Sequence, residues 1–94
     1  MNSPAEPGLR PLRLLLVEDT QDDALLLLRT LRKGGFEPDY ERVETPDALR
    51  DALAAGGWDF VISDYTMPEF SGLQALAIVR ELTPQLPFII VSGT

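Results

Sequence analysis

Residues 12–19 read LRLLLVED, a nearly continuous apolar run that ends in the two acids Glu18 and Asp19. A strand whose two faces are both covered by helices shows this pattern, because no position in it has to face water. The run therefore predicts a strand inside a parallel sheet, with an acidic pair at its carboxyl end.

Other segments repeat this arrangement farther along the chain. Residues 60–62, Phe-Val-Ile, lead into Ser63 and Asp64, and residues 88–91, Phe-Ile-Ile-Val, lead into Ser92. A short segment at residues 40–44 predicts one more strand between the first and third runs. The four segments together predict one sheet.

Between these strands the apolar period changes to that of a helix. Thr45 and Pro46 fit a helix cap followed by proline at the first helical position, and the third helix is expected to start at Ser71 and Gly72. The positions predicted to be buried are Ala24, Leu27, Leu28 and Leu31 in the first helix, Ala48, Leu49, Ala52 and Leu53 in the second, and Ala75, Ile78, Val79 and Leu82 in the third. Strand and helix alternate as βαβαβαβ, which predicts an α/β fold with right-handed crossovers.

Composition narrows the possible functions. The 94 residues allow one hydrophobic core. Fifteen acidic and eight basic residues give a net charge of −7, which opposes direct nucleic-acid binding and favours a cation as ligand. The chain has no cysteine and no histidine, so disulfides, thiolate metal sites and imidazole chemistry within the chain are excluded.

Residues 1–11, MNSPAEPGLRP, hold three prolines, and we expect them to form a flexible arm before a domain that covers residues 12–94. No apolar stretch reaches the about 18 residues of a membrane span. A signal peptide is not supported either, and we expect a cytoplasmic protein without membrane contact.

The polar residues at the strand ends carry the candidate chemistry. In an open parallel α/β sheet, ligands bind outside the carboxyl ends of the strands. Glu18 and Asp19 end the first strand, Asp64 ends the third and Ser92 follows the fourth, so these groups should meet at one edge of the sheet. Each acid alone could instead cap a helix or lie in a solvated turn, and Asp19 and Thr20 are plausible N-caps.

Three carboxylates at one edge repel one another unless a cation lies between them. Mg²⁺ prefers carboxylates, waters and a substrate phosphate, and an aspartate can attack phosphorus to form an aspartyl phosphate. In this hypothesis Asp64 is the nucleophile, and Asp19 binds the metal directly while Glu18 reaches it through water. The backbone carbonyl of Thr66 is a further metal ligand, and Ser92 donates a hydrogen bond to the phosphoryl group.

The segments LRLLLVED, ISDYTMPEFSG and LPFIIVSGT together resemble the CheY-like receiver domain of bacterial response regulators, including receivers attached to hybrid sensor kinases. The resemblance covers roughly residues 12–94. It implies a flavodoxin-like three-layer sandwich with strand order 2-1-3-4. It also implies that Glu18 and Asp19 form an acidic pocket, Asp64 is the phosphorylation site, Thr66 supplies a carbonyl ligand and Ser92 is the switch hydroxyl. Met67 and Pro68 match the family's loop pattern, and we expect an apolar plug and a rigid turn to be the whole of their role.

The resemblance also implies a fifth strand, with a lysine at its end, and the sequence stops just after the fourth strand. We interpret the chain as a shortened receiver, in which acceptance of phosphate is slowed or absent because that lysine is missing. We also expect the uncovered fourth strand to pair with a second copy, either edge to edge or by exchange of elements.

Three functions follow in order of preference. The first is a receiver that takes a phosphoryl group from a sensor histidine kinase or phosphotransfer domain, and not a turnover enzyme. The second is a receiver-like module kept for protein contact or dimerisation without phosphorylation. The third is a phosphatase of the haloacid dehalogenase type, which is disfavoured because such enzymes carry a D-x-D pair after the first strand. Here the third strand is followed by Asp64-Tyr65-Thr66.

Overall fold

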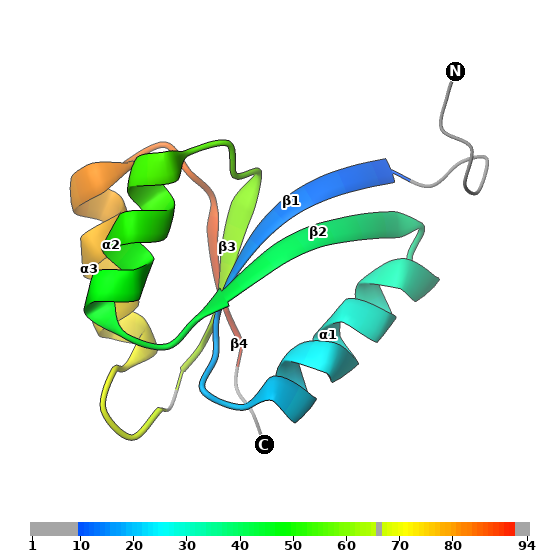
Figure 1. Ribbon diagram of the computed structural model, residues 1–94, viewed down its shortest axis with the longest axis horizontal. Helices are drawn as coiled ribbons and strands as arrows, with labels where there is room; N and C mark the ends of the chain where they lie inside the picture. Colours follow the sequence, from blue (N-terminus) through cyan, green and yellow to red (C-terminus); the bar gives the residue numbers. More distant parts are fainter. Residues whose placement is uncertain (1–9, 66, 92–94) are drawn as a thin grey trace.

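The computed structural model describes residues 10–65 and 67–91 (Figure 1). Strands and helices alternate along them. In chain order they are β1 (Arg10–Val17), α1 (Gln21–Lys33), β2 (Phe36–Val43), α2 (Pro46–Ala55), β3 (Phe60–Asp64), α3 (Gly72–Leu82) and β4 (Phe88–Val91). The four strands are parallel in the order β2-β1-β3-β4, which confirms the predicted fold and strand order.

The molecule has three layers (Figure 1). Helix α1 covers one face of the sheet, and α2 and α3 lie side by side on the other. Two apolar clusters fill the spaces between layers, one on each face. This is the three-layer sandwich expected from the sequence.

Strand β1 is the centre of this packing. Leu14 and Leu16 belong to the cluster under α1, whereas Leu15 and Val17 belong to the cluster under α2 and α3. All four side chains are at most 1% exposed. The apolar run at residues 14–17 is therefore explained by burial on both faces of one strand.

Strand β1 begins at Arg10, two residues before the strand predicted from the sequence. The expectation of a flexible arm over residues 1–11 is therefore wrong for Arg10 and Pro11, which belong to β1. The Arg10 N–H donates to the Gly35 carbonyl on the β2 side, so the proline nitrogen one residue later points to the opposite side. The pairing of β1 with β3 starts only at Leu14, and the missing N–H of Pro11 breaks no ladder bond. Residues 1–9 of the expected arm lie outside the described residues.

Strand β2 is also longer than predicted, because it starts at Phe36 and not at Tyr40. Its first half, Phe-Glu-Pro-Asp, has low strand propensity. Pairing with β1 over eight residues overrides that propensity. Pro38 is tolerated because β2 is an edge strand of the described sheet.

Helices α2 and α3 begin where the sequence predicted. The Thr45 side chain accepts a hydrogen bond from the Ala48 N–H, and Ser71 and Gln74 form a reciprocal capping box at the start of α3. The prediction that Leu82 is buried is wrong. This residue is the last of α3 and is 47% exposed. Leu86 and Phe88, just after the helix, pack against the core there instead. None of the described helices is long and apolar enough to cross a membrane.

Candidate functional site

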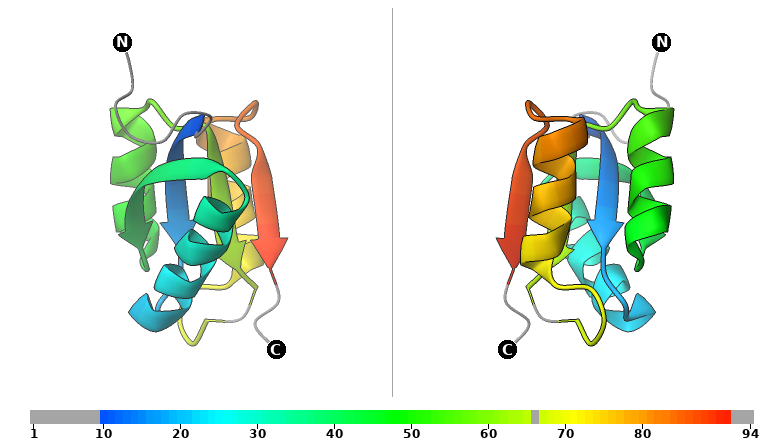
Figure 2. Two further views of the ribbon diagram at one scale, coloured as in Figure 1. Left: turned by 90° about the vertical axis from the view of Figure 1, so that its right-hand side faces the viewer. Right: turned by 90° about the vertical axis from the view of Figure 1, so that its left-hand side faces the viewer.

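The carboxyl ends of the strands meet at one edge of the sheet, where the arrowheads in Figure 2 point. Val17 pairs in register with Ser63, and Asp64 pairs with Val91. The residues that follow β1 and those that end β3 are therefore neighbours across the sheet. This register brings the acidic pair of the first strand close to Asp64.

Glu18, Asp19 and Asp64 each offer a carboxylate oxygen, and these oxygens lie within 4.8 Å of one another. None of the three residues is fully exposed. The predicted convergence of the three acids is thus confirmed. Thr66 and Ser92, the other two predicted site residues, lie outside the described residues.

Asp19 does not cap helix α1. The N-cap position belongs to Thr20, whose side chain makes no cap hydrogen bond. The Thr20 hydroxyl instead donates to Asp19 Oδ1 at 3.4 Å. Capping therefore does not account for the position of the Asp19 carboxylate at this edge of the sheet.

Glu18 is held at the turn from β1 into α1. Its N–H donates to the Val43 carbonyl at 3.0 Å, and its Oε2 accepts from the Thr20 N–H at 3.2 Å. The pKa of Glu18 is raised to about 7, mainly by burial. The hydrogen bond from the Thr20 N–H lowers it, and the charge of Asp64, the Asp19 side chain and Asp23 contribute to the rise. Desolvation and charge repulsion thus disfavour the ionised form of Glu18.

These residues fit a hard divalent cation. Direct ligands of Mg²⁺ lie about 2.1 Å from the ion, so two of them are at most about 4.2 Å apart. A set of carboxylate oxygens within 4.8 Å reaches that spacing with small side-chain shifts. Cation charge would offset the repulsion that raises the pKa of Glu18.

Helix α3 fixes the backbone of Asp64. The Gly72 N–H donates to the Tyr65 carbonyl at 3.1 Å, and a Cβ atom on Gly72 would lie 2.7 Å from the Asp64 carbonyl oxygen. The fully buried Ser63 hydroxyl donates to that same carbonyl at 3.0 Å. Tyr65 N–H is bound to the Val91 carbonyl. Sequence alone indicates no role for Ser63 and only a helix start for Gly72, although both contact the main chain of Asp64.

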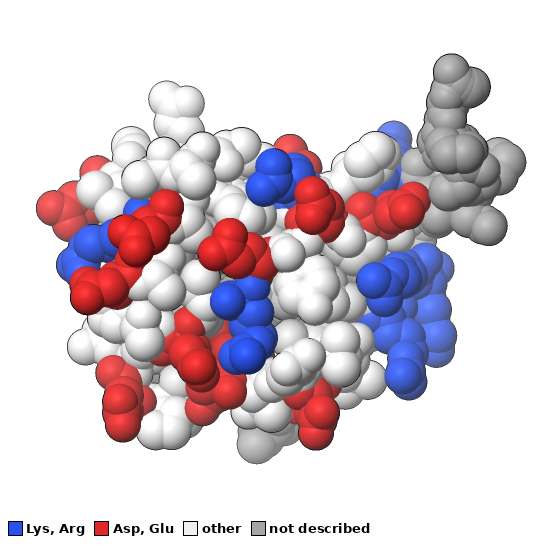
Figure 3. Space-filling view, in the orientation of Figure 1, with Lys and Arg blue, Asp and Glu red and all other residues white. Residues whose placement is uncertain are grey.

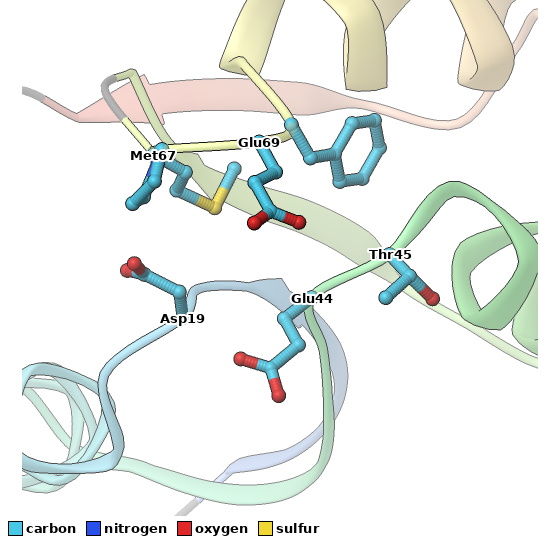
Figure 4. A pocket seen from close by; sticks show the side chains of 7 residues that line it. Asp19, Glu44, Thr45, Met67 and Glu69 are labelled. Carbon is cyan, nitrogen blue, oxygen red and sulfur yellow. The ribbon is translucent and has the colours of Figure 1, made fainter.

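Two hollows flank the three acids. Asp19 lines a cavity of about 370 Å³ together with Glu44, Thr45, Met67, Pro68, Glu69 and Phe70. Figure 4 shows its acidic side chains arising from the ends of β1 and β2 and from the loop before α3. Glu18 and Asp64 line a second hollow of about 280 Å³ with Asp23, Leu26, Leu27, Thr30 and Val91. The sequence did not point to Glu44 or Glu69, because neither acid directly follows an apolar run.

The loop residues Met67 and Pro68 differ in their surroundings. Met67 is buried in the core cluster under α2 and α3, whereas Pro68 is exposed. This burial confirms the prediction that Met67 fills the core as an apolar plug.

Comparison with known proteins identifies the family. Residues 14–94 match the family described as response regulator receiver domain, and the chain belongs to that family. It is 35% identical over 81 residues to the response regulator protein FleR of Pseudomonas aeruginosa, covering 86% of this chain and 17% of FleR. It is 37% identical over 83 residues to the sensor kinase CckA of Brucella abortus, covering 85% of this chain and 8% of CckA. The chain therefore spans a small part of these relatives.

A solved structure supports the same conclusion. The response regulator protein TrrA of Thermotoga maritima, in complex with Mg²⁺ and BeF, superposes with a TM-score of 0.72 at 28% identity, covering 87% of this chain and 70% of that one. The same TrrA has been solved in complex with the histidine kinase ThkA, with a TM-score of 0.65 at 28% identity over 86% of this chain and 68% of that one. The receiver fold is thus shared with a protein that binds Mg²⁺ and a histidine kinase.

Gly72→Ala tests the close approach of α3 to Asp64. The added methyl must displace the Asp64 carbonyl, and we expect a loss of about 1–3 kcal/mol in unfolding free energy. Gly34→Ala is the matched control, because its Cβ would meet atoms no closer than 3.5 Å and we expect a change within about 0.5 kcal/mol. Urea unfolding of both variants measures the difference. Equal effects would show that Gly72 is not in tight contact.

The raised pKa of Glu18 predicts a pH-dependent stability without metal. The unfolded chain ionises Glu18 near 4.5 and the folded chain near 7, so the folded state binds more protons in between and loses stability as pH rises through that window. Glu18→Gln removes this effect. Relative to wild type, we expect the variant to gain about 1–2 kcal/mol between about pH 4 and pH 8, after discounting for the partly exposed site. Urea unfolding in chelator measures the gain, and a difference that does not change with pH would contradict the shift.

Proposed function

We propose that this receiver accepts a phosphoryl group on Asp64 from a phosphohistidine of another protein, in a reaction that requires Mg²⁺. The observation that supports this most directly is the set of three carboxylate oxygens within 4.8 Å at the carboxyl end of β1 and β3. Asp64 ends β3 itself, so its carboxylate sits on a rigid strand and not on a mobile loop. Family membership supports the same role.

In the transfer, an Asp64 carboxylate oxygen attacks phosphorus in line with the leaving imidazole nitrogen. The new O–P bond forms as the P–N bond breaks, and the bonding electron pair stays on the donor's imidazole, which takes up a proton from solvent if needed. The Asp64 O–P bond is the only covalent bond that this chain forms in the reaction. The protein's contribution is to hold Asp64 in place, through the Ser63 hydroxyl and the contact with Gly72.

Asp19 and Asp64 would hold Mg²⁺ directly, with Glu18 acting through water. We further propose that the Thr66 carbonyl is a metal ligand and that the Ser92 hydroxyl contacts the phosphoryl group. When bound, the ion supplies positive charge opposite the equatorial phosphoryl oxygens. Without the ion, the three carboxylates would repel the negatively charged phosphoryl oxygens.

The phosphodonor has to be another protein or domain, because this chain contains no histidine. The hollow lined by Glu18 and Asp64 also holds Leu26, which is 60% exposed on α1. An apolar side chain beside the acceptor suits contact with a partner's surface. A sensor histidine kinase or a phosphotransfer domain is the partner class we propose.

The alternative function is a receiver-like module that binds partners without being phosphorylated. It is supported by the exposed apolar side chains Leu25 and Leu26 on α1, which are 45% and 60% exposed, and by the basic last turn of that helix. Figure 3 shows basic side chains gathered at that end of α1. The first turn of α1 lies next to Glu18 and Asp19, so Lys33 is three helical turns away from the site. Lys33 therefore lies on the surface of α1 away from the acidic site.

We also propose that two copies associate through β4. In the described sheet β4 pairs only with β3, and Ile89 and Ile90 are 46% and 36% exposed. An uncovered apolar edge strand favours pairing with another chain. Edge-to-edge pairing and exchange of elements both fit this exposure.

Acetyl phosphate with Mg²⁺ tests the phosphoacceptor role. We expect the intact mass to increase by one phosphoryl group, and we expect no increase for Asp64→Asn or in excess chelator. Asp19→Asn should slow the gain by about 10²-fold, because the metal loses a direct ligand. Absence of any gain in the wild type would favour the binding module. A gain retained in Asp64→Asn would place the acceptor elsewhere.

Light scattering at tens of micromolar tests the association. We expect a dimer for the wild type and a monomer for Ile89→Lys, which puts a charge on the exposed edge strand. Leu73→Lys changes a residue of similar exposure on α3, and this variant should remain a dimer. A monomeric wild type would contradict the proposal.

A further inference from the structure

Arg42 lies on β2 at the edge of the acidic site. It pairs in register with Leu16, one residue before the last pair of the β1–β2 ladder, Val17 with Val43. Its side chain is 27% exposed, compared with 47% for Arg13 and 51% for Arg50. The Arg42 side chain is thus covered by neighbouring residues to a greater extent than those of Arg13 and Arg50. It packs beside the turn that follows β1.

The guanidinium binds the main chain of that turn. Arg42 Nη1 donates to the Glu18 carbonyl at 3.0 Å, and the same nitrogen lies 3.7 Å from Glu44 Oε1. The neighbouring backbone bond, from the Glu18 N–H to the Val43 carbonyl, is the last bond between β2 and the chain leaving β1. The Arg42 side chain thus adds one more bond from β2 just where the chain turns toward α1.

The Glu18 carbonyl belongs to the same peptide group as the Asp19 N–H. This group is planar, so fixing its carbonyl also fixes the nitrogen and Cα of Asp19, from which the Asp19 side chain extends. Glu18 is held from both sides, at its N–H by Val43 and at its carbonyl by Arg42. A guanidinium suits this task because its N–H donors are rigidly arranged and always charged.

We infer that Arg42 is a positioning residue of the metal site, which orients Glu18 and Asp19 through its hydrogen bond to the Glu18 carbonyl. This inference rests on the proposed function, because it assigns Arg42 a role toward the cation that the three carboxylates would hold. Groups outside the direct ligands commonly set metal affinity in this way. Arg42 would act through the main chain of Glu18, so it is a positioning residue and not a catalytic one.

Calorimetric titration with Mg²⁺ alone tests the inference. We expect Arg42→Ala to weaken Mg²⁺ binding about 10- to 100-fold. Arg42→Gln keeps a side-chain N–H donor without the charge, and it should restore most of the affinity. Arg50→Ala removes an equal charge from α2, where Arg50 pairs with Asp47, and should bind Mg²⁺ as the wild type does. Wild-type affinity in Arg42→Ala, or equal losses in Arg42→Ala and Arg42→Gln, would overturn the role of the hydrogen bond.

Amide hydrogen exchange without metal separates this inference from the proposed function. We expect Arg42→Ala to speed exchange of the Glu18 N–H at least tenfold, while the amides of Leu15 and Leu16 keep their protection. This readout does not depend on metal binding. If the wild type bound no Mg²⁺ and the Glu18 amide still lost protection, the metal site would fail and the positioning of the turn would stand. Unchanged exchange at Glu18 would overturn the inference whatever the metal does.

Discussion

Parallel pairing of β1 with β2 on one side and β3 on the other is the constraint on which the structure depends. It buries β1 on both faces, and it sends the carboxyl ends of the strands to one edge. The apolar run that makes β1 the core strand thereby carries an acidic pair directly to Asp64. The core and the site are consequences of the same register, and a slip of one residue would destroy both.

That register has an energetic cost, because it holds three carboxylates within 4.8 Å in partly buried positions. The pKa of Glu18, raised to about 7, is the direct sign of this cost. Natural proteins keep such destabilising arrangements at functional sites. Neighbouring groups hold the acids in place: Val43 and Arg42 hold the main chain of Glu18, while Ser63 and Gly72 hold that of Asp64. The repulsion is therefore not relieved by movement of the backbone, and a divalent cation is the simplest means of relieving it.

Much of this could be predicted from the sequence, because the decisive signals are local. The apolar run at residues 14–17 and the acids that follow it define both strand and site without knowledge of the partner strands. The extensions of β1 to Arg10 and of β2 to Phe36 could not be predicted, since pairing overrides the weak propensity of Pro11 and Pro38. The same holds for Arg42 and Ser63, whose roles arise from contacts that only the folded chain creates. Leu82 follows the helical period but lies beyond the last turn that the sheet covers.

If the three acids form a cation site, Mg²⁺ must stabilise the folded chain, and urea unfolding at about pH 8 over a series of Mg²⁺ concentrations measures this effect. We expect the unfolding free energy to rise by about 1.4 kcal/mol for each tenfold increase in Mg²⁺ above the dissociation constant. Asp19→Asn should shift this rise to higher concentration. A wild-type stability that does not change with Mg²⁺, or that rises equally in Asp19→Asn, would contradict the cation site.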